Sequence, residues 1–243
     1  MGQTAITLDA YGTLLHLRDP VPRLARLLAD GGYPNPEQQV RAGLRAEIDY
    51  YRANLDEGRD MASLQGLRMR CAAVLATALG NPPPVLTMVE LMLDSLVFEL
   101  YPETLSALSQ LSCAGHRLAV VSNWDYSLPD TLAQLGILDS FEVVVDSATG
   151  PGRKPEPEIF LEALSALGVA PDRALHCGDI AEVDGVGARR AGMAAVVLNR
   201  AGGELSSWKS RTINSLDELS AHAAWLLQDR RPGPLDRGTR APN

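Results

Sequence analysis

Short, continuous hydrophobic runs recur along the chain and predict strands. They are rich in Val, Leu and Ala and do not alternate with polar residues, as is typical of strands buried on both faces of a parallel sheet. These predicted strands cover residues 4–8, 117–121, 142–145, 174–177 and 194–198. Helix-like stretches lie between and after them, at residues 103–114, 128–135, 156–167, 183–191 and 216–227. The alternation predicts an α/β fold with right-handed crossovers, that is, a doubly wound parallel sheet.

One long segment interrupts this alternation and predicts a separate helical unit. No convincing strand occurs between residues 20 and 100, where helix-like runs cover residues 21–29, 37–54, 61–79 and 85–100. We expect residues 17–100 to form an α-helical cap over a catalytic core that comprises residues 1–16 and 101–228. Residues 229–243 are polar and rich in Pro and Gly, and they predict a mobile tail.

Composition and charge exclude several classes of protein. The 243 residues are 46% hydrophobic and 21% charged, which allows a packed core and excludes wholesale disorder. The net charge of −8 disfavours nucleic acid and anionic membrane surfaces as partners. No apolar run could span a membrane, the first residues lack the features of a secretory signal, and the three cysteines have neither disulfide nor zinc spacing. We expect a cytoplasmic protein, monomeric or homodimeric, that acts on a small molecule.

Polar residues follow four of the predicted strands, and the one after residues 142–145, Lys154, comes only past a Gly-rich loop. In an open parallel sheet, ligands bind outside the carboxyl ends of the strands, so side chains at these positions converge on one crevice. Taken singly, each is as well explained as a turn, cap or solvated residue. It is their order, each at the end of a strand, that indicates a site. The converging residues are Asp9, Thr13, Ser122, Asn123, Lys154, Asp179 and Asp184.

The charges in this crevice indicate which ligands it could hold. Three carboxylates and one lysine give a local charge of about −2, which is unfavourable when the groups are packed closely. A divalent cation offsets that charge, and hard oxygen ligands suit Mg²⁺. With the cation present, Ser122 and Lys154 could hold a small anionic substrate, which favours phosphoryl chemistry.

Four motifs, in this order, resemble those of the haloacid dehalogenase-like hydrolase superfamily. They are Asp9-Ala-Tyr-Gly-Thr13, Ser122-Asn123, Lys154-Pro155 and Gly178-Asp179-x4-Asp184. The resemblance covers about residues 4–200, and it implies a Rossmann-like core with a cap inserted between the first two motifs.

The resemblance also implies roles for these residues. Asp9 would be the nucleophile that forms a covalent aspartyl intermediate, and Ser122 and Lys154 would bind the transferred group. Mg²⁺ would be held by Asp9, the backbone carbonyl of Tyr11 and Asp179, with Asp184 in support. Further candidates for substrate contact are Thr13, Asn123 and Trp124 near the motifs and Arg45, Tyr50, Tyr51 and Arg52 on the cap. Arg45 and Asp49 also have the i,i+4 spacing of an exposed ion pair.

One position departs from the pattern of the superfamily's phosphatases. These usually carry a second Asp, a general acid, two residues after the nucleophile, where this chain has Tyr11. The motif Asp-x-Tyr-Gly-Thr resembles the 2-haloacid dehalogenases instead, in which a departing halide needs no proton. Their fourth motif, however, has Ser and Asn where this chain has Asp179 and Ala181. We favour a magnesium-dependent phosphatase-type enzyme; the alternatives are a 2-haloacid dehalogenase and a non-catalytic regulator that binds Mg²⁺ and phosphate.

Overall fold

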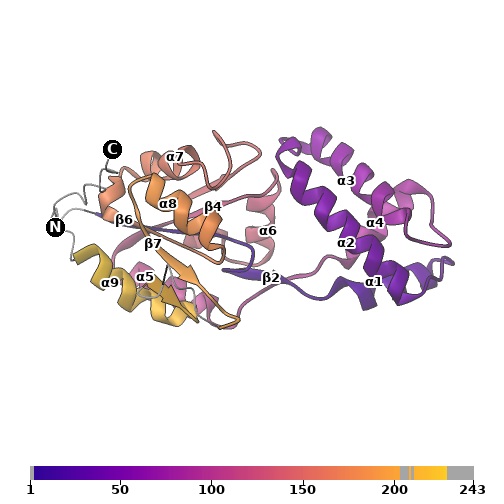
Figure 1. Cartoon of the computed structure of the whole chain (residues 1–243), viewed down its shortest axis with the longest axis horizontal. Coiled ribbons are helices and arrows are strands. Elements are labelled where there is room, and N and C mark those ends of the chain that lie inside the picture. Colours follow the sequence, from indigo (N-terminus) through magenta and orange to yellow (C-terminus); the bar gives the residue numbers. More distant parts are fainter. Residues whose placement is uncertain (1–2, 203–207, 209–210, 229–243) are drawn as a thin grey trace, which may run out of the picture.

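The computed structural model describes residues 3–202, 208 and 211–228, and its larger part is built on a parallel sheet (Figure 1). Within these residues the sheet has six strands in the order β5-β4-β1-β6-β7-β8. They are β1 (Thr4–Leu8), β4 (His116–Ser122), β5 (Val143–Asp146), β6 (Ala174–Gly178), β7 (Ala194–Leu198) and β8 (Thr212–Ile213). The strand order reverses direction beside β1, which is the topology of a doubly wound sheet. The predicted fold class is therefore confirmed.

Helices cover both faces of this sheet. On one face pack α5 (Thr104–Cys113), α6 (Leu128–Gln134) and α9 (Leu219–Gln228), and on the other pack α7 (Glu158–Leu167) and α8 (Val186–Arg190). Successive side chains of a strand point to opposite faces, so Ile6 of β1 enters one core and Ala5 the other. Both faces are buried, which explains why the strands are continuously hydrophobic.

The inserted segment, for which we keep the name cap, is a group of helices with a hydrophobic core of its own. It contains α1 (Pro20–Asp30), α2 (Glu37–Asn54), α3 (Met61–Ala76) and α4 (Val85–Ser95). Their buried side chains form a separate hydrophobic cluster. Figure 1 shows this unit in purple, beside the sheet and its flanking helices.

A two-stranded antiparallel ribbon joins the cap to the core. It pairs β2 (Leu15–Leu17) with β3 (Phe98–Leu100). The sequence predicts a helix over 85–100 and no strand in the insertion, and this prediction is wrong at its end, because α4 stops at Ser95. A strand of three residues is stabilised by its partner, and that partner lies at the other end of the insertion. The boundary expected after residue 16 falls inside this ribbon.

Two other elements also differ from their prediction. The helix expected over 183–191 begins with a π-helical turn, Ala181–Gly185, and becomes α-helical only in α8. The helix expected over 216–227 starts with a 3₁₀ turn, Leu216–Glu218, at which Ser215 and Glu218 form a capping box, and it becomes α-helical only in α9. The tail expected over 229–243 lies outside the described residues.

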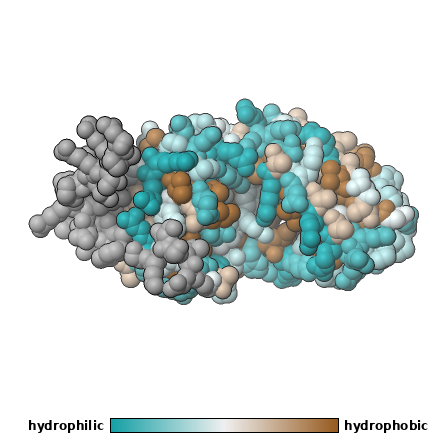
Figure 2. Space-filling model, in the orientation of Figure 1, coloured by the Kyte–Doolittle hydropathy of each residue, from teal (hydrophilic) through white to brown (hydrophobic). Residues whose placement is uncertain are grey.

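The surface is mostly polar on the face shown in Figure 2, where hydrophobic residues form small, separate patches. Among the described helices, none has both the length and the hydrophobicity that crossing a membrane would require.

Removing a core side chain of α7 should destabilise the fold. Phe160 is fully buried, and its ring meets the ring of His176 edge-on, with centroids 4.9 Å apart. We expect Phe160→Ala to lower the free energy of unfolding by about 3–5 kcal/mol, because it leaves a cavity between α7 and the sheet. Urea denaturation measures the change. The neighbouring Leu161 is 41% exposed, so Leu161→Ala should lower it by less than about 1 kcal/mol. Equal losses in the two variants would contradict this assignment of the core.

Candidate active site

The carboxyl ends of parallel strands bring the predicted polar residues together at one edge of the sheet. Asp9 follows β1, Ser122 ends β4 and Asp179 follows β6. Because β1 lies between β4 and β6 in parallel register, these positions are neighbours. Lys154 reaches them from the loop that follows β5.

Lys154 is a buried cation of this site. Its Nζ donates to Asp9 Oδ1 at 2.5 Å and to Asp184 Oδ1 at 2.6 Å, and the residue is 3% exposed. Ser122 Oγ donates to the same Asp9 oxygen at 2.9 Å. The other oxygen, Asp9 Oδ2, has Thr13 Oγ1 at 3.5 Å. Oδ2 is therefore the less engaged oxygen of Asp9, and the one better placed to react or to meet a cation.

Asp184 is held by hydrogen bonds at both of its carboxylate oxygens. Besides Lys154, Nε2 of His176 lies 3.2 Å from Oδ1, and the backbone N–H of Ile180 donates to Oδ2 at 2.9 Å. Burial lowers the pKa of His176, so its ring is neutral at pH 7. A neutral ring can donate to Asp184 through Nε2 while Nδ1, 2.8 Å from Thr7 Oγ1, accepts. His176 thus supports Asp184 from within the sheet.

Two glycines let carboxylates approach the backbone closely. Gly12 has a φ of +86°, and a Cβ at this position would lie 2.2 Å from Asp179 Oδ2. A Cβ on Gly178 would lie 2.2 Å from the carboxylate carbon of Asp184. A larger residue at either position would displace an acidic group of the site.

Burial and mutual repulsion shift the pKa values of the three carboxyl groups. Burial, followed by the charges of Asp9 and Asp184, raises the pKa of Asp179 to about 7. Burial also raises the pKa of Asp9, against the opposing effect of Lys154. Burial alone would raise the pKa of Asp184, but the ammonium of Lys154 and the hydrogen bond from His176 keep it well below its usual range. Negative charge in this cluster is thus only partly compensated by the protein.

The donor set of the cluster fits a divalent cation. Asp9, Asp179 and Asp184 each offer a carboxylate oxygen, and these oxygens all lie within 4.8 Å of one another. In the described part of the chain, no neighbouring side chain donates a hydrogen bond to Asp179, so its oxygens are available to a cation. Asp184 is already bonded at both oxygens, so it suits a supporting role better than direct coordination. Hard oxygen donors of this kind match Mg²⁺.

The remaining predicted residues have different surroundings. Asn123 clamps the backbone of Lys154, because its Oδ1 accepts from the Lys154 N–H at 2.8 Å and its Nδ2 donates to the Lys154 carbonyl at 3.0 Å. Trp124 is 8% exposed and packs on Phe98 in the core, with ring centroids 5.4 Å apart. Its ring is thus a packing element, although we expected a substrate contact. Tyr11 is 40% exposed, so it is not buried beneath the cap.

Polar contacts tie the cap to the core beside the second motif. Tyr51 on α2 donates its hydroxyl proton to Asp125 Oδ2 at 2.7 Å. Asp56 accepts from Ser147 Oγ at 2.5 Å and pairs with Arg153 at 3.0 Å. The sequence indicated Tyr51 as a candidate for substrate contact, but its hydrogen bond to Asp125 of the core was not expected.

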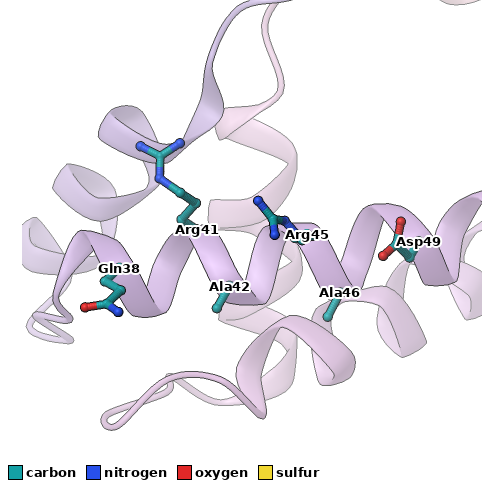
Figure 3. A pocket seen from close by; sticks show the side chains of 6 residues that line it. All are labelled: Gln38, Arg41, Ala42, Arg45, Ala46 and Asp49. Carbon is teal, nitrogen blue, oxygen red and sulfur yellow. The ribbon is translucent and has the colours of Figure 1, made fainter.

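Arg45, another cap residue considered for substrate contact, lies on a different surface. With Arg41 and Asp49 it lines a pocket of about 390 Å³ along α2 (Figure 3). All of the residues that line this pocket belong to α2, and none of them belongs to the acidic cluster.

Comparison with known proteins matches most of the chain to one family. The sequence model of the haloacid dehalogenase-like hydrolase family matches residues 3–192. A glyceraldehyde 3-phosphate phosphatase of Methanopyrus kandleri is 41% identical over 101 residues, which is 41% of this chain and 43% of that protein. The matched stretches cover about half or less of the length of the first curated relatives.

Solved structures agree with this match. The crystal structure of a HAD phosphatase from Thermococcus onnurineus has a TM-score of 0.64 at 25% identity, and the match covers 90% of this chain and 97% of that one. A 2-haloacid dehalogenase from Pseudomonas syringae also has a TM-score of 0.64, at 24% identity, with 92% and 100% covered. The second likeness concerns the fold alone.

Neutralising Asp179 should stabilise the metal-free protein in a pH-dependent way. The pKa of Asp179 is about 7 in the folded chain, against an ordinary value of 3.8 for an Asp side chain, so folding raises it. Between these pH values the unfolded chain loses this proton while the folded chain retains it, and stability falls as the pH rises. Asp179→Asn removes this penalty. With chelator present, its melting temperature should exceed that of the wild type by more at pH 8 than at pH 5.

Differential scanning fluorimetry with and without Mg²⁺ measures both parts of this prediction. Mg²⁺ should raise the melting temperature of the wild type more than that of Asp179→Asn. Asp139→Asn, at an exposed position, serves as the matched control and should behave like the wild type. An advantage of Asp179→Asn that is the same at pH 5 and pH 8 would be inconsistent with a raised pKa.

Proposed function

The chain belongs to the haloacid dehalogenase-like hydrolases, and we propose that it is a magnesium-dependent phosphatase that acts on a small phosphorylated metabolite. The observation that carries this proposal is the acidic cluster at the sheet edge. Asp9, Asp179 and Asp184 are held within 4.8 Å of one another, with Lys154 as the cation between two of them. Because the site is negatively charged, it favours the binding of a cation, and an anionic phosphate can bind once the cation is present.

The negative charge of the cluster also argues against an anionic substrate that binds without a metal ion. A haloacid carries a carboxylate, which would have to lie beside Asp9 and Asp179 without a compensating ion. Burial and the neighbouring carboxylates already raise the pKa of Asp179 to about 7, so a further negative charge would be unfavourable. Electrostatics thus supports the phosphatase over the dehalogenase.

Asp9, Asp179 and the backbone carbonyl of Tyr11 are the groups that we expect to hold Mg²⁺. When bound, Mg²⁺ neutralises negative charge on the cluster and on the phosphoryl group. The other phosphate contacts would come from Ser122 Oγ and Lys154 Nζ, which bond to Asp9 Oδ1 in the structure. Both donors are buried, and Lys154 Nζ has a third proton that it could donate to a phosphate oxygen, whereas the single proton of the Ser122 hydroxyl would turn from Asp9 Oδ1 to the phosphate.

The reaction that we propose has two steps at phosphorus. Asp9 Oδ2 attacks phosphorus while the bond to the leaving oxygen breaks, which yields an aspartyl phosphate and an alkoxide, phenolate or carboxylate. Water then attacks phosphorus, the bond to Asp9 breaks, and phosphate is released with the carboxylate of Asp9 restored. Lys154 and Ser122 orient the phosphoryl group in both steps.

The residue at position 11 limits which leaving groups can depart from phosphorus. A general acid two residues after the nucleophile would protonate the leaving oxygen, and Tyr11 replaces it. Good leaving groups, as in aryl and acyl phosphates, depart without that proton. We therefore expect aryl or acyl phosphates to be better substrates than alkyl phosphates.

Two further expectations accompany this function. Phosphatases occur among the relatives, in accord with a small anionic substrate. We also place the enzyme in the cytoplasm as a monomer or homodimer, where Cys71, Cys113 and Cys177, all free thiols in the structure, would stay reduced.

A second candidate function is 2-haloacid dehalogenase activity. It is favoured by Tyr11, because the first motif resembles that of the dehalogenases and a departing halide needs no proton. In that reaction Asp9 would displace halide from carbon to form an ester, which water would then hydrolyse.

Parallel assays separate the two candidates. With p-nitrophenyl phosphate we expect release of nitrophenolate that requires Mg²⁺, stops on chelation and is lost in Asp9→Asn. Chloride release from 2-chloropropionate that is indifferent to chelator would instead support the dehalogenase. If neither substrate is turned over although calorimetry shows Mg²⁺ binding, the chain is a non-catalytic binder.

Supplying the missing acid should broaden the range of leaving groups. We expect Tyr11→Asp to raise kcat for an alkyl phosphate by about 10²-fold, because a carboxylic acid at this position can protonate the alkoxide. The gain for p-nitrophenyl phosphate should be much smaller, and the ratio of the two rates is the measurement. Tyr11→Asn, which cannot supply the proton, is the matched control. A Tyr11→Asp variant that binds Mg²⁺ but gains nothing would show that protonation does not limit this site.

A further inference from the structure

Arg200 is a charged residue that none of the four motifs contains, yet it reaches the turn that follows the nucleophile. It stands two residues after the end of β7, at the same edge of the sheet as Asp9. Its Nε donates to the Gly12 carbonyl at 3.3 Å, and its Nη2 donates to the Thr13 carbonyl at 2.9 Å. One planar guanidinium therefore binds two successive carbonyls of the turn.

The same guanidinium also binds the chain where it returns from the cap. Its Nη1 pairs with the carboxylate of Glu103, and its carbon lies 3.5 Å from the centre of the Tyr101 ring. The Tyr101 ring in turn contacts His16 of β2, with centroids 4.9 Å apart. Arg200 thus joins the turn after Asp9 to the base of the β2–β3 ribbon.

The turn that Arg200 holds determines the geometry of the acidic cluster. Its backbone hydrogen bonds run back to the Ala10 carbonyl from the N–H groups of Thr13 and Leu14. The other side of the turn touches Asp179, since a Cβ on Gly12 would lie 2.2 Å from its carboxylate. A displacement of this turn therefore changes the spacing between the nucleophile and Asp179.

We propose that Arg200 is a positioning residue of the hydrolytic reaction, which fixes the turn after Asp9 against both the sheet and the root of the cap. It touches carbonyl oxygens and not the reacting atoms, so its effect is on the geometry of attack. Displacing a reacting group by about 1 Å can lower the rate by about 10²-fold. This inference rests on the proposed phosphatase function for its kinetic part only.

The test compares Arg200→Ala with Arg117→Ala. Arg117 is a matched control, because it also binds a carboxylate, that of Glu142, and a backbone carbonyl, that of Leu167, but at the amino end of β4. We expect Arg200→Ala to lower kcat for p-nitrophenyl phosphate by about 10²-fold with little change in KM, because Ser122 and Lys154 still bind phosphate. Guanidinium added below denaturing concentration should restore part of kcat, and Arg200→Lys should be intermediate. Arg117→Ala should keep the wild-type kcat.

Amide hydrogen exchange supplies a readout that needs no turnover. In Arg200→Ala, exchange should become faster in peptides covering residues 9–15 and 101–104 and stay unchanged elsewhere in the sheet. Arg117→Ala should leave both peptides at wild-type rates. Unchanged exchange in these peptides would overturn the proposal. If the wild type is active, a wild-type kcat in Arg200→Ala would overturn it as well.

The activity of the wild type distinguishes failure of the proposed function from failure of this inference. If wild-type protein hydrolyses no phosphate ester, the phosphatase proposal fails, and the exchange experiment alone decides whether Arg200 holds the turn. Faster exchange confined to the two peptides then supports the positioning role, and unchanged exchange refutes it.

Discussion

The structure depends on one electrostatic constraint, which is that three carboxylates are held together at a buried edge of the sheet. Lys154 compensates part of this charge by bonding to Asp9 and Asp184. Asp179 is left without such a partner in the described chain, and its pKa of about 7 reflects burial and the repulsion of its neighbours. Because a cation would compensate the remaining negative charge, we expect the folded chain to bind one at this edge.

Much of the surrounding structure keeps the carboxylates in place. His176 and the Ile180 N–H fix Asp184, while Asn123 clamps the backbone of Lys154. Gly178 leaves room for the Asp184 carboxylate at the end of β6. Of these supports, His176 and Gly178 are buried, Asn123 is partly buried, and Ile180 contributes through its backbone N–H. Groups held in place before a ligand binds favour electrostatic catalysis.

The cap and the ribbon that joins it to the core also contact residues near the site. Tyr51 and Asp56 contact core residues beside the second motif, and Arg200 binds the turn after Asp9 together with the root of the ribbon. Tyr11, which is 40% exposed, stands where the proposed reaction would need a proton donor. In that proposal, the cluster and the missing acid together favour phosphate esters with stable leaving groups.

The doubly wound sheet and most of the cluster could be predicted from the hydrophobic pattern, because buried parallel strands are continuously hydrophobic and their carboxyl ends share one edge. The same rule could have identified Arg200, which follows the fifth predicted strand. Only the tertiary structure decided that residues 98–100 form a strand with residues 15–17 and that Trp124 packs in the core. It also decided that both oxygens of Asp184 are engaged. These features depend on partners distant in sequence, and local hydrophobic pattern carries no information about which distant groups meet.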